Sequence, residues 1–282
     1  MKYVILPIII IFFFSCDKNY NGKFADTKHN LFTISCTVKD STYNAIFDTG
    51  TEISSFPNRN ISPSQKELHS YLFSRDTIII EYLKYAIVTV GNINTVSRFG
   101  FDLSEISHAV IGNDIIQKYY WKINFVNKTF SMFSRPILFD LERYTIIPYT
   151  IDRGNMVYCV DSISILIDTG ASVRTSAKDG ITGEVIRIGK IDFDVVSNRT
   201  WDYLQRELNL IPNEKRTQIC SDIRFGDINI EQAELRKYIL SSDHPVRTSV
   251  SGGIDIIMTL DALKRFGIIY IDPYKQLLYL KK

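Results

Sequence analysis

The chain of 282 residues has few cysteines and histidines and no excess of charge of either sign. Four cysteines are too few for a disulfide scaffold, and none forms a Cys-x-x-Cys pair. The four histidines never lie four residues apart, which excludes the helical motif of zinc proteases. The net charge is +2, and no basic run of five or more residues occurs. We therefore expect no metal, no cofactor and no nucleic acid partner.

Long apolar runs are also missing, although overall hydrophobicity is ordinary. Hydrophobic residues make up 45% of the chain and charged residues 23%, which is typical of a globular protein and excludes a disordered one. The run VILPIIIIFFF has about eleven residues, too short for a membrane-spanning helix but typical of a signal peptide. The sequence therefore predicts a signal segment over residues 1–16 and an exported protein.

The end of this segment, Ser15-Cys16, is similar to the lipobox of bacterial lipoproteins, in which the cysteine becomes the acylated N-terminus. The resemblance implies a palmitate-type lipid anchor on Cys16. It also implies a place in the bacterial cell envelope, facing the periplasm or the exterior. Phe13 stands where the family usually has an aliphatic residue. An ordinary secretory signal and an uncleaved anchor remain as alternatives. The polar residues 17–30 are predicted to form a flexible tether.

An internal repeat divides the rest of the chain. Residues 44–54 read NAIFDTGTEIS and residues 164–174 read SILIDTGASVR, so that two Asp-Thr-Gly motifs lie 120 positions apart. A second pair of similar blocks follows at residues 110–133 and 256–280. The same order in both halves predicts two duplicated lobes. We place them at residues 31–140 and 141–282.

In each motif, the aspartate is expected where an apolar strand ends and a turn begins. Glycine at the third position permits a close approach of the backbone that a side chain would block. When two such carboxyl groups meet, they cannot both ionise easily, so one keeps a proton while the other activates water. This chemistry hydrolyses peptide bonds, and it makes Asp48 and Asp168 the candidate catalytic residues.

These motifs resemble those of the pepsin and retropepsin superfamily of aspartic peptidases. AIFDTGT together with VIGNDII is particularly similar to the retroviral type. The resemblance implies an all-β fold, mainly strands with a few short helices, built as two duplicated lobes with a catalytic cleft between them. It implies hydrogen bonds between threonines across the lobe interface and glycines close to the substrate. The residues expected to support the catalytic turns are Thr49, Gly50, Thr51, Thr169, Gly170 and Ala171.

This resemblance implies an endopeptidase that cleaves an extended polypeptide, and the N-terminal segment adds the expectation that it is exported and lipid-anchored. Because one chain supplies both aspartates, a monomer is expected. The alternative is a catalytically silent lipoprotein that binds peptides or a partner with the same fold. The presence of Asp-Thr-Gly in both lobes favours the peptidase.

The two motifs differ at the residue after glycine. The hydroxyl of Thr51 can donate a hydrogen bond to Asp48 and favour its charged form, whereas Ala171 offers no hydroxyl to Asp168. We therefore expect Asp48 to be the more acidic member of the pair and Asp168 to hold the proton.

Other features of the sequence leave open questions. Thr259 stands where the first lobe has Gly112, which puts the packing behind Asp168 in question. A substrate-covering flap is expected near residues 70–90. The remaining cysteines, Cys36, Cys159 and Cys220, are either buried strand residues or include one disulfide.

Short elements are expected throughout the chain. Short helices are expected after Asp114 and Asp261 and at residues 201–209, where apolar residues have helical spacing. The predicted strands are residues 31–38, 43–48, 77–91, 129–133, 156–168, 185–196, 223–230 and 268–280.

Overall fold

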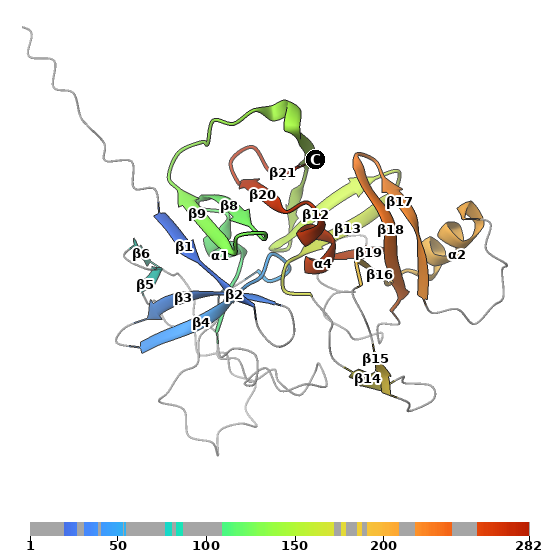
Figure 1. Cartoon of the computed structure of the whole chain (residues 1–282), viewed down its shortest axis with the longest axis horizontal. Helices are drawn as coiled ribbons and strands as arrows, with labels where there is room; N and C mark the ends of the chain where they lie inside the picture. Colours follow the sequence, from blue (N-terminus) through green and yellow to red (C-terminus); the bar gives the residue numbers. More distant parts are fainter. Residues whose placement is uncertain are drawn as a thin grey trace, which may run out of the picture.

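A computed structural model gives the fold of most of the chain (Figure 1). It describes residues 20–26, 31–38, 41–52, 54, 77–80, 83–86, 109–171, 176–178, 185–187, 191–208, 218–238 and 253–281.

Both halves of the chain contribute to one six-stranded antiparallel sheet. Its strand order is β1-β9-β8-β20-β21-β10. The first three strands come from the first half of the chain and the last three from the second. Their bounds are β1 Tyr20–Lys23, β9 Thr129–Phe133, β8 Tyr120–Asn124, β20 Ile268–Asp272, β21 Leu277–Lys281 and β10 Tyr144–Pro148. We call this element the shared sheet.

The first lobe is built on a second sheet with the strand order β6-β5-β3-β4-β7, and β2 pairs with β3. Strands β4 and β7 run parallel, and the short helix α1 follows β7. The bounds are β2 Ala25–Asp26, β3 Phe32–Val38, β4 Ser41–Phe47, β5 Thr77–Ile80, β6 Leu83–Ala86, β7 Ala109–Ile111 and α1 Asn113–Ile116.

The second lobe is built on a seven-stranded sheet with the order β11-β12-β13-β19-β16-β18-β17. Strands β13 and β19 run parallel, and the helix α4 follows β19. The strands are β11 Thr150–Asp152, β12 Asn155–Val160, β13 Ile163–Asp168, β16 Phe193–Val195, β17 Gln218–Phe225, β18 Ile228–Lys237 and β19 Ile256–Thr259. A separate hairpin and the remaining helices are β14 Ser176–Lys178, β15 Val185–Arg187, α2 Asn198–Glu207, α4 Leu260–Arg265 and the 3₁₀ helix η4 Leu141–Arg143.

The two lobes repeat one plan. In each, an antiparallel pair leads to an aspartate turn, a parallel strand joins the second member of the pair, a short helix follows, and a hairpin enters the shared sheet. The matching hairpins are β8–β9 and β20–β21, and the matching edge strands are β1 and β10. The prediction of a mainly β, duplicated, two-lobed fold is confirmed.

The predicted tether over residues 17–30 is wrong for residues 20–26. Strand β1 extends the shared sheet by pairing with β9, and Phe24 is 6% exposed. Its ring lies 4.9 Å from that of Phe32, centroid to centroid. The prediction failed because it rested on the polar composition of the segment. One aromatic residue of the segment is buried, and its backbone groups form hydrogen bonds with a neighbouring strand.

Several predicted strands are hairpins in the structure. The range 156–168 turns at Asp161 and Ser162, both of which have positive φ, and the range 223–230 turns at Gly226. The range 268–280 is the hairpin β20–β21. Both strands of each hairpin are rich in apolar residues. The sequence pattern therefore did not reveal the turn between them, and each hairpin was predicted as one strand. The three predicted helices correspond to α1, α4 and α2.

Of the flap expected at residues 70–90, only the hairpin β5–β6 is described, and it pairs with β3. The other flap residues lie outside the described ranges. The three cysteines in the described part of the chain are free thiols. Cys36 is buried as expected, whereas Cys159 and Cys220 are exposed because they occupy outward positions of β12 and β17.

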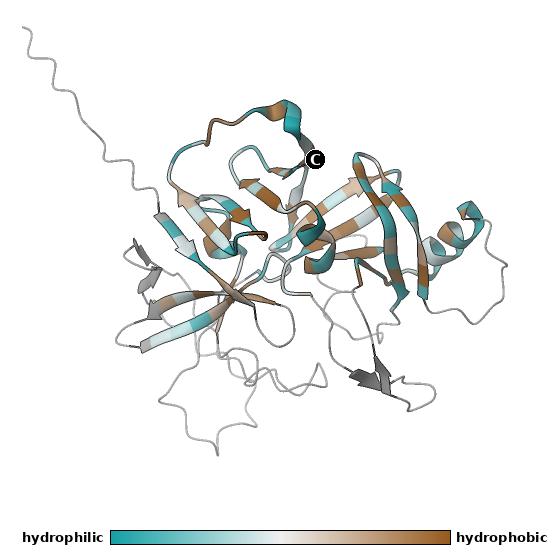
Figure 2. Cartoon of the chain, in the orientation of Figure 1, coloured by the Kyte–Doolittle hydropathy of each residue, from teal (hydrophilic) through white to brown (hydrophobic). Residues whose placement is uncertain are grey.

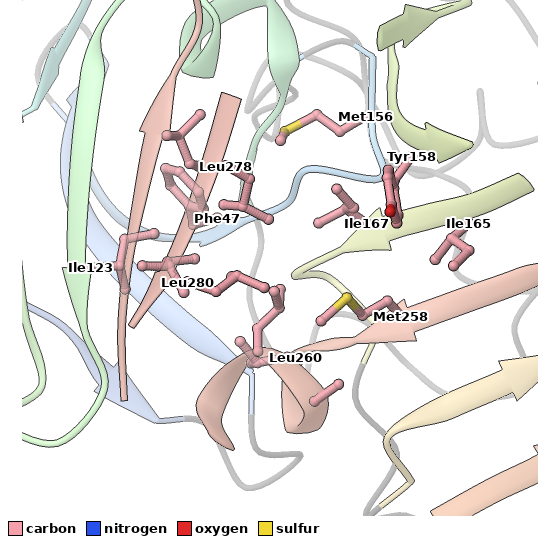
Figure 3. Packing of buried hydrophobic residues seen from close by; sticks show 14 of the residues in the cluster. Phe47, Ile123, Met156, Tyr158, Ile165, Ile167, Met258, Leu260, Leu278 and Leu280 are labelled. Atoms are coloured by element: carbon pink, nitrogen blue, oxygen red, sulfur yellow. The ribbon is translucent and has the colours of Figure 1, made fainter. Parts of the chain in front are cut away.

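The main hydrophobic core joins the lobes to the shared sheet. Figure 3 shows Leu278 and Leu280 of the shared sheet near Phe47 of the first lobe, with Ile167 of the second lobe close by. The rings of Phe47 and Trp121 meet edge to face at 4.9 Å. The strand that carries each aspartate therefore rests on the buried face of the shared sheet. Among the described residues, no helix is long and apolar enough to cross a membrane.

The buried ring of Phe24 gives a test of the revised N-terminus. We expect Phe24→Ala to lower the free energy of unfolding by about 3 kcal/mol, because the change removes a large buried ring and leaves a cavity. The neighbouring exposed Lys23 provides the control, and Lys23→Ala should change stability by less than about 0.5 kcal/mol. Urea unfolding of both variants measures the difference. Equal stabilities would show that residues 20–26 do not pack against the domain.

Candidate active site

The two Asp-Thr-Gly turns lie at the ends of equivalent strands. Strand β4 ends at Phe47, directly before Asp48, and β13 ends at Asp168. A parallel neighbour holds each strand end: the Asp48 N–H donates to the carbonyl of Ile111 over 3.0 Å, and Asp168 pairs with Thr259. The fold therefore brings two residues 120 positions apart to the same place.

Threonine side chains join the two turns through four reciprocal hydrogen bonds. The N–H of Thr49 donates to the hydroxyl oxygen of Thr169, and the N–H of Thr169 donates to that of Thr49, both over 3.0 Å. The Thr49 hydroxyl donates to the carbonyl of Ile167, and the Thr169 hydroxyl to that of Phe47, both over 2.7 Å. Both threonines are 1% exposed. These bonds hold the two turns in one fixed relation.

The glycines allow the carboxyl groups to approach. A Cβ atom on Gly50 would lie 2.5 Å from the carboxyl carbon of Asp168, and a Cβ on Gly170 would collide with the carboxyl group of Asp48. Each glycine therefore lies directly against the carboxyl group of the opposite lobe. Any side chain at either position would force the two turns apart.

The two carboxyl groups have different hydrogen-bond donors. Asp48 accepts from the N–H of Gly50 over 2.8 Å and from the hydroxyl of Thr51 over 2.7 Å. Among the described residues, the donors to Asp168 are backbone N–H groups, that of Gly170 over 2.8 Å and that of Ala171 over 2.9 Å. This is the asymmetry expected from the residues that follow the two glycines.

Burial raises the pKa of both aspartates, and the two are not raised equally. The hydroxyl of Thr51 and the N–H of Gly50 oppose the rise in the pKa of Asp48. Burial and the neighbouring charge of Asp48 raise the pKa of Asp168 well above its ordinary value. Asp168 is therefore the member that keeps a proton while Asp48 is charged.

Asn113 supports the first turn, and the sequence did not single it out. Its side-chain amide donates to the carbonyl of Thr49 and to the carbonyl of Gly154, both over 2.7 Å. Gly154 lies in the turn between β11 and β12, so one side chain connects the first Asp-Thr-Gly turn to the second lobe. The equivalent position in the second lobe is Leu260, which cannot make such bonds. The motif VIGNDII marked this place, but the partners of the asparagine are far away in sequence.

Ser54 and Asp114 also brace the first turn. Asp114 accepts from the N–H and the hydroxyl of Ser54 over 2.8 and 2.6 Å, and the N–H of Gly112 donates to the same hydroxyl over 2.9 Å. Ser54 is fully buried. This network fixes the chain that leaves the first turn against the start of α1.

The concern about Thr259 behind Asp168 is resolved by its hydroxyl. Thr259 is fully buried, and its hydroxyl donates to the carbonyl of Ile191 and accepts from the N–H of Asp261 at the start of α4. A hydroxyl is tolerated in this buried place because it both donates and accepts a hydrogen bond. The buried carboxylate of Asp192 pairs with the exposed Arg265 and holds the neighbouring segment, and the carbonyl of Asp192 accepts from the N–H of Thr259.

Cys16 and its surroundings lie outside the described residues. The candidate active site consists of the two turns and their supports. Within the described part of the chain, no group of three or more His, Cys, Asp or Glu side chains is arranged to hold a metal ion.

No family model matches the chain, and a search of curated proteins finds no relative. Among solved structures, the chain is similar to the aspartic proteinase from Irpex lacteus, with a TM-score of 0.48 and 12% sequence identity. The likeness covers 94% of this chain and 97% of the other.

The threonine bonds can be tested at one position. Thr169→Val keeps the shape of the side chain but removes a hydroxyl that accepts from Thr49 and donates to Phe47. Because a buried N–H and a buried carbonyl lose their partners, we expect the free energy of unfolding to fall by about 3 kcal/mol. Thr169→Ser keeps the hydroxyl and should lose only about 1 kcal/mol. Urea unfolding compares the two; a smaller loss for Val than for Ser would contradict this role.

Proposed function

We propose that the protein is an exported, lipid-anchored aspartic endopeptidase. The observation that carries this proposal is the pair of carboxyl groups, Asp48 and Asp168, held against each other by reciprocal hydrogen bonds and by glycines that admit no side chain. The unequal pKa shifts add to it, because a charged and a protonated carboxyl group side by side supply a base and an acid.

The mechanism follows from these two protonation states. The Asp48 carboxylate removes a proton from a water molecule, and the water oxygen bonds to the carbonyl carbon of the scissile peptide. Asp168 donates its proton to the carbonyl oxygen, which gives a neutral tetrahedral diol. When the diol collapses, the C–N bond breaks, the nitrogen takes the proton held on Asp48, and the departing diol proton returns to Asp168. Each carboxyl group ends in the state in which it began.

The surrounding residues have positioning roles in this proposal. Thr49 and Thr169 fix the distance between the lobes, and Asn113 holds the backbone of the first turn. Backbone N–H groups of the turns point at the carboxyl oxygens and hold them in place. A preorganised pair of this kind needs little rearrangement during reaction.

The substrate class is proposed to be polypeptide in an extended conformation, since an extended backbone leaves the scissile carbonyl open to an attacking water. The membrane anchor is proposed to be a lipid on Cys16, and the location the bacterial cell envelope facing the periplasm or the exterior. The support for the anchor is the short apolar run that ends in Ser15-Cys16.

The function is tested by removing one carboxyl group at a time. We expect Asp48→Asn and Asp168→Asn each to lower kcat about a thousandfold or more, because the two groups act as one unit. The exposed Asp202 of α2 provides the matched control, and Asp202→Asn should keep full activity. Digestion of a peptide library by each variant, with and without a statine-type inhibitor, is the measurement.

Mixing the two inactive variants tests the monomer. Because both aspartates come from one chain, the mixture should stay inactive. Restored activity would show that the site forms between chains. A parent protein that folds, binds peptides and cleaves none of them would contradict the peptidase and favour the binding protein.

The pH profile tests the role of Thr51. Its hydroxyl stabilises the charged form of Asp48, so Thr51→Ala should raise the pKa of that group and move the acidic limb of kcat/KM upward by about one pH unit. Thr51→Ser keeps a hydroxyl and should leave the limb in place. Ala171→Ser adds a donor beside Asp168 and should lower the basic limb. If the acidic limb of Thr51→Ala moves downward, the hydroxyl does not tune the pair.

A further inference from the structure

The shared sheet has one face toward the lobes and one face away from them. Register partners lie on the same face of a sheet. Trp121, Ile271 and Leu278 are partners on the buried face, where Trp121 meets Phe47 beneath the first catalytic turn. The outer face, defined by partners such as Tyr270 and Tyr279, therefore points away from the two aspartates.

The segment that joins the lobes, residues 134–143, crosses this outer face, and we call it the linker. The ring of Phe139 stacks on that of Tyr270 at 4.3 Å and meets Tyr279 edge to face at 5.0 Å. In Figure 1 the linker lies at the upper edge of the view, beyond β20 and β21, whereas β3 and β4 lie below. One aromatic side chain thus fastens the linker to the sheet.

The linker turns other apolar side chains outward. Leu138 is 98% exposed and Leu141 is 52% exposed. They lie three positions apart in the sequence, and both border a cavity of about 170 Å³ between the linker and the sheet. Figure 2 shows the hydrophobic stretch of the linker as a brown band that ends in hydrophilic residues. We call Leu138 and Leu141 the linker patch.

The N-terminal segment enters the fold at one edge of the same sheet, next to the strand from which the linker departs. Strand β1 begins at Tyr20, which pairs with Met132, two residues before the linker begins. Cys16 stands four residues before Tyr20, a distance of at most about 14 Å in extended chain. A lipid on Cys16, or an uncleaved apolar segment, would therefore hold this end of the shared sheet close to the bilayer.

We propose that the linker patch is a membrane contact in which Leu138 and Leu141 enter the lipid surface. This inference rests on the membrane attachment in the proposed function. The lipid anchor restrains only the position of the protein, whereas the patch adds a second contact that fixes its orientation. In this orientation the outer face of the shared sheet lies on the bilayer, and the two aspartates face away from it toward exported polypeptides.

Charged residues border the patch without giving it one sign. Arg135 and Arg143 are exposed on the linker, as are Asp140 and Glu142, and Arg143 pairs with Asp140 over 3.1 Å. Lys275 also lines the cavity. Because the linker charges balance, the apolar side chains determine the contact, and a zwitterionic lipid surface suffices.

Fluorescence quenching tests the contact directly. The full chain, carrying its own N-terminal segment, is purified from membranes and reconstituted into phosphatidylcholine vesicles with or without brominated acyl chains. Leu138→Trp places an indole in the patch. Val126→Trp is the matched control, because Val126 is 76% exposed at the opposite end of β8 and β9. The parent gives the background of Trp121 and Trp201, which are 0% and 2% exposed.

Brominated lipid should quench the indole of Leu138→Trp and leave that of Val126→Trp unchanged. Mass spectrometry of the N-terminus reads the acylation of Cys16 independently. Quenching without acylation would support the membrane contact of the linker patch and would contradict the lipid anchor of the proposed function. Absence of quenching in Leu138→Trp would overturn the proposed membrane contact of the linker patch. It would not affect the proposed lipid anchor or the proposed peptidase activity. An emission shift that depends on protein concentration in the absence of vesicles would assign the patch to a second copy of the chain and overturn the lipid contact.

Discussion

The reciprocal bonding of Thr49 and Thr169 is the constraint on which the site depends. Each threonine accepts from the backbone of the opposite turn and donates to the carbonyl of the residue before the opposite aspartate. These four hydrogen bonds are buried, so any displacement of one turn against the other would break them. The polar groups would then have no hydrogen-bond partner, because water does not reach them. The approach of the carboxyl groups, their raised pKa values and the need for glycine beside each all follow from this fixed relation.

The duplication is symmetric where geometry must be shared and asymmetric where chemistry requires a difference. The strand pairs, the parallel neighbours and the hairpins of the shared sheet correspond between lobes. The residues around the carboxyl groups do not: Thr51 faces Asp48 whereas Ala171 brings only a backbone N–H to Asp168. Two identical carboxyl groups at close range share a proton evenly, and a single extra donor is enough to decide which of them keeps it.

The shared sheet connects the site to the rest of the molecule. Its buried face supports the strands that carry the aspartates, its outer face carries the linker, and its edge includes the N-terminal strand β1. A segment of polar composition is therefore part of the fold, and the chain enters the sheet next to β9, the strand from which the linker departs. In the proposed orientation, attachment and catalysis occupy opposite faces of one sheet.

The sequence by itself determined the elements that are local or repeated: the two Asp-Thr-Gly turns, the mainly β class, the duplication and the short helices. These signals lie in adjacent residues, where apolar periodicity and glycine act directly on the backbone. It did not determine that Phe24 is buried, that the apolar ranges near 161 and 226 turn back as hairpins, or that Asn113 connects the lobes. Each of these depends on a partner distant along the chain, such as Phe32 for Phe24 and Gly154 for Asn113. Only the tertiary structure decided them, because burial and hydrogen bonding are satisfied by neighbours in space rather than in sequence.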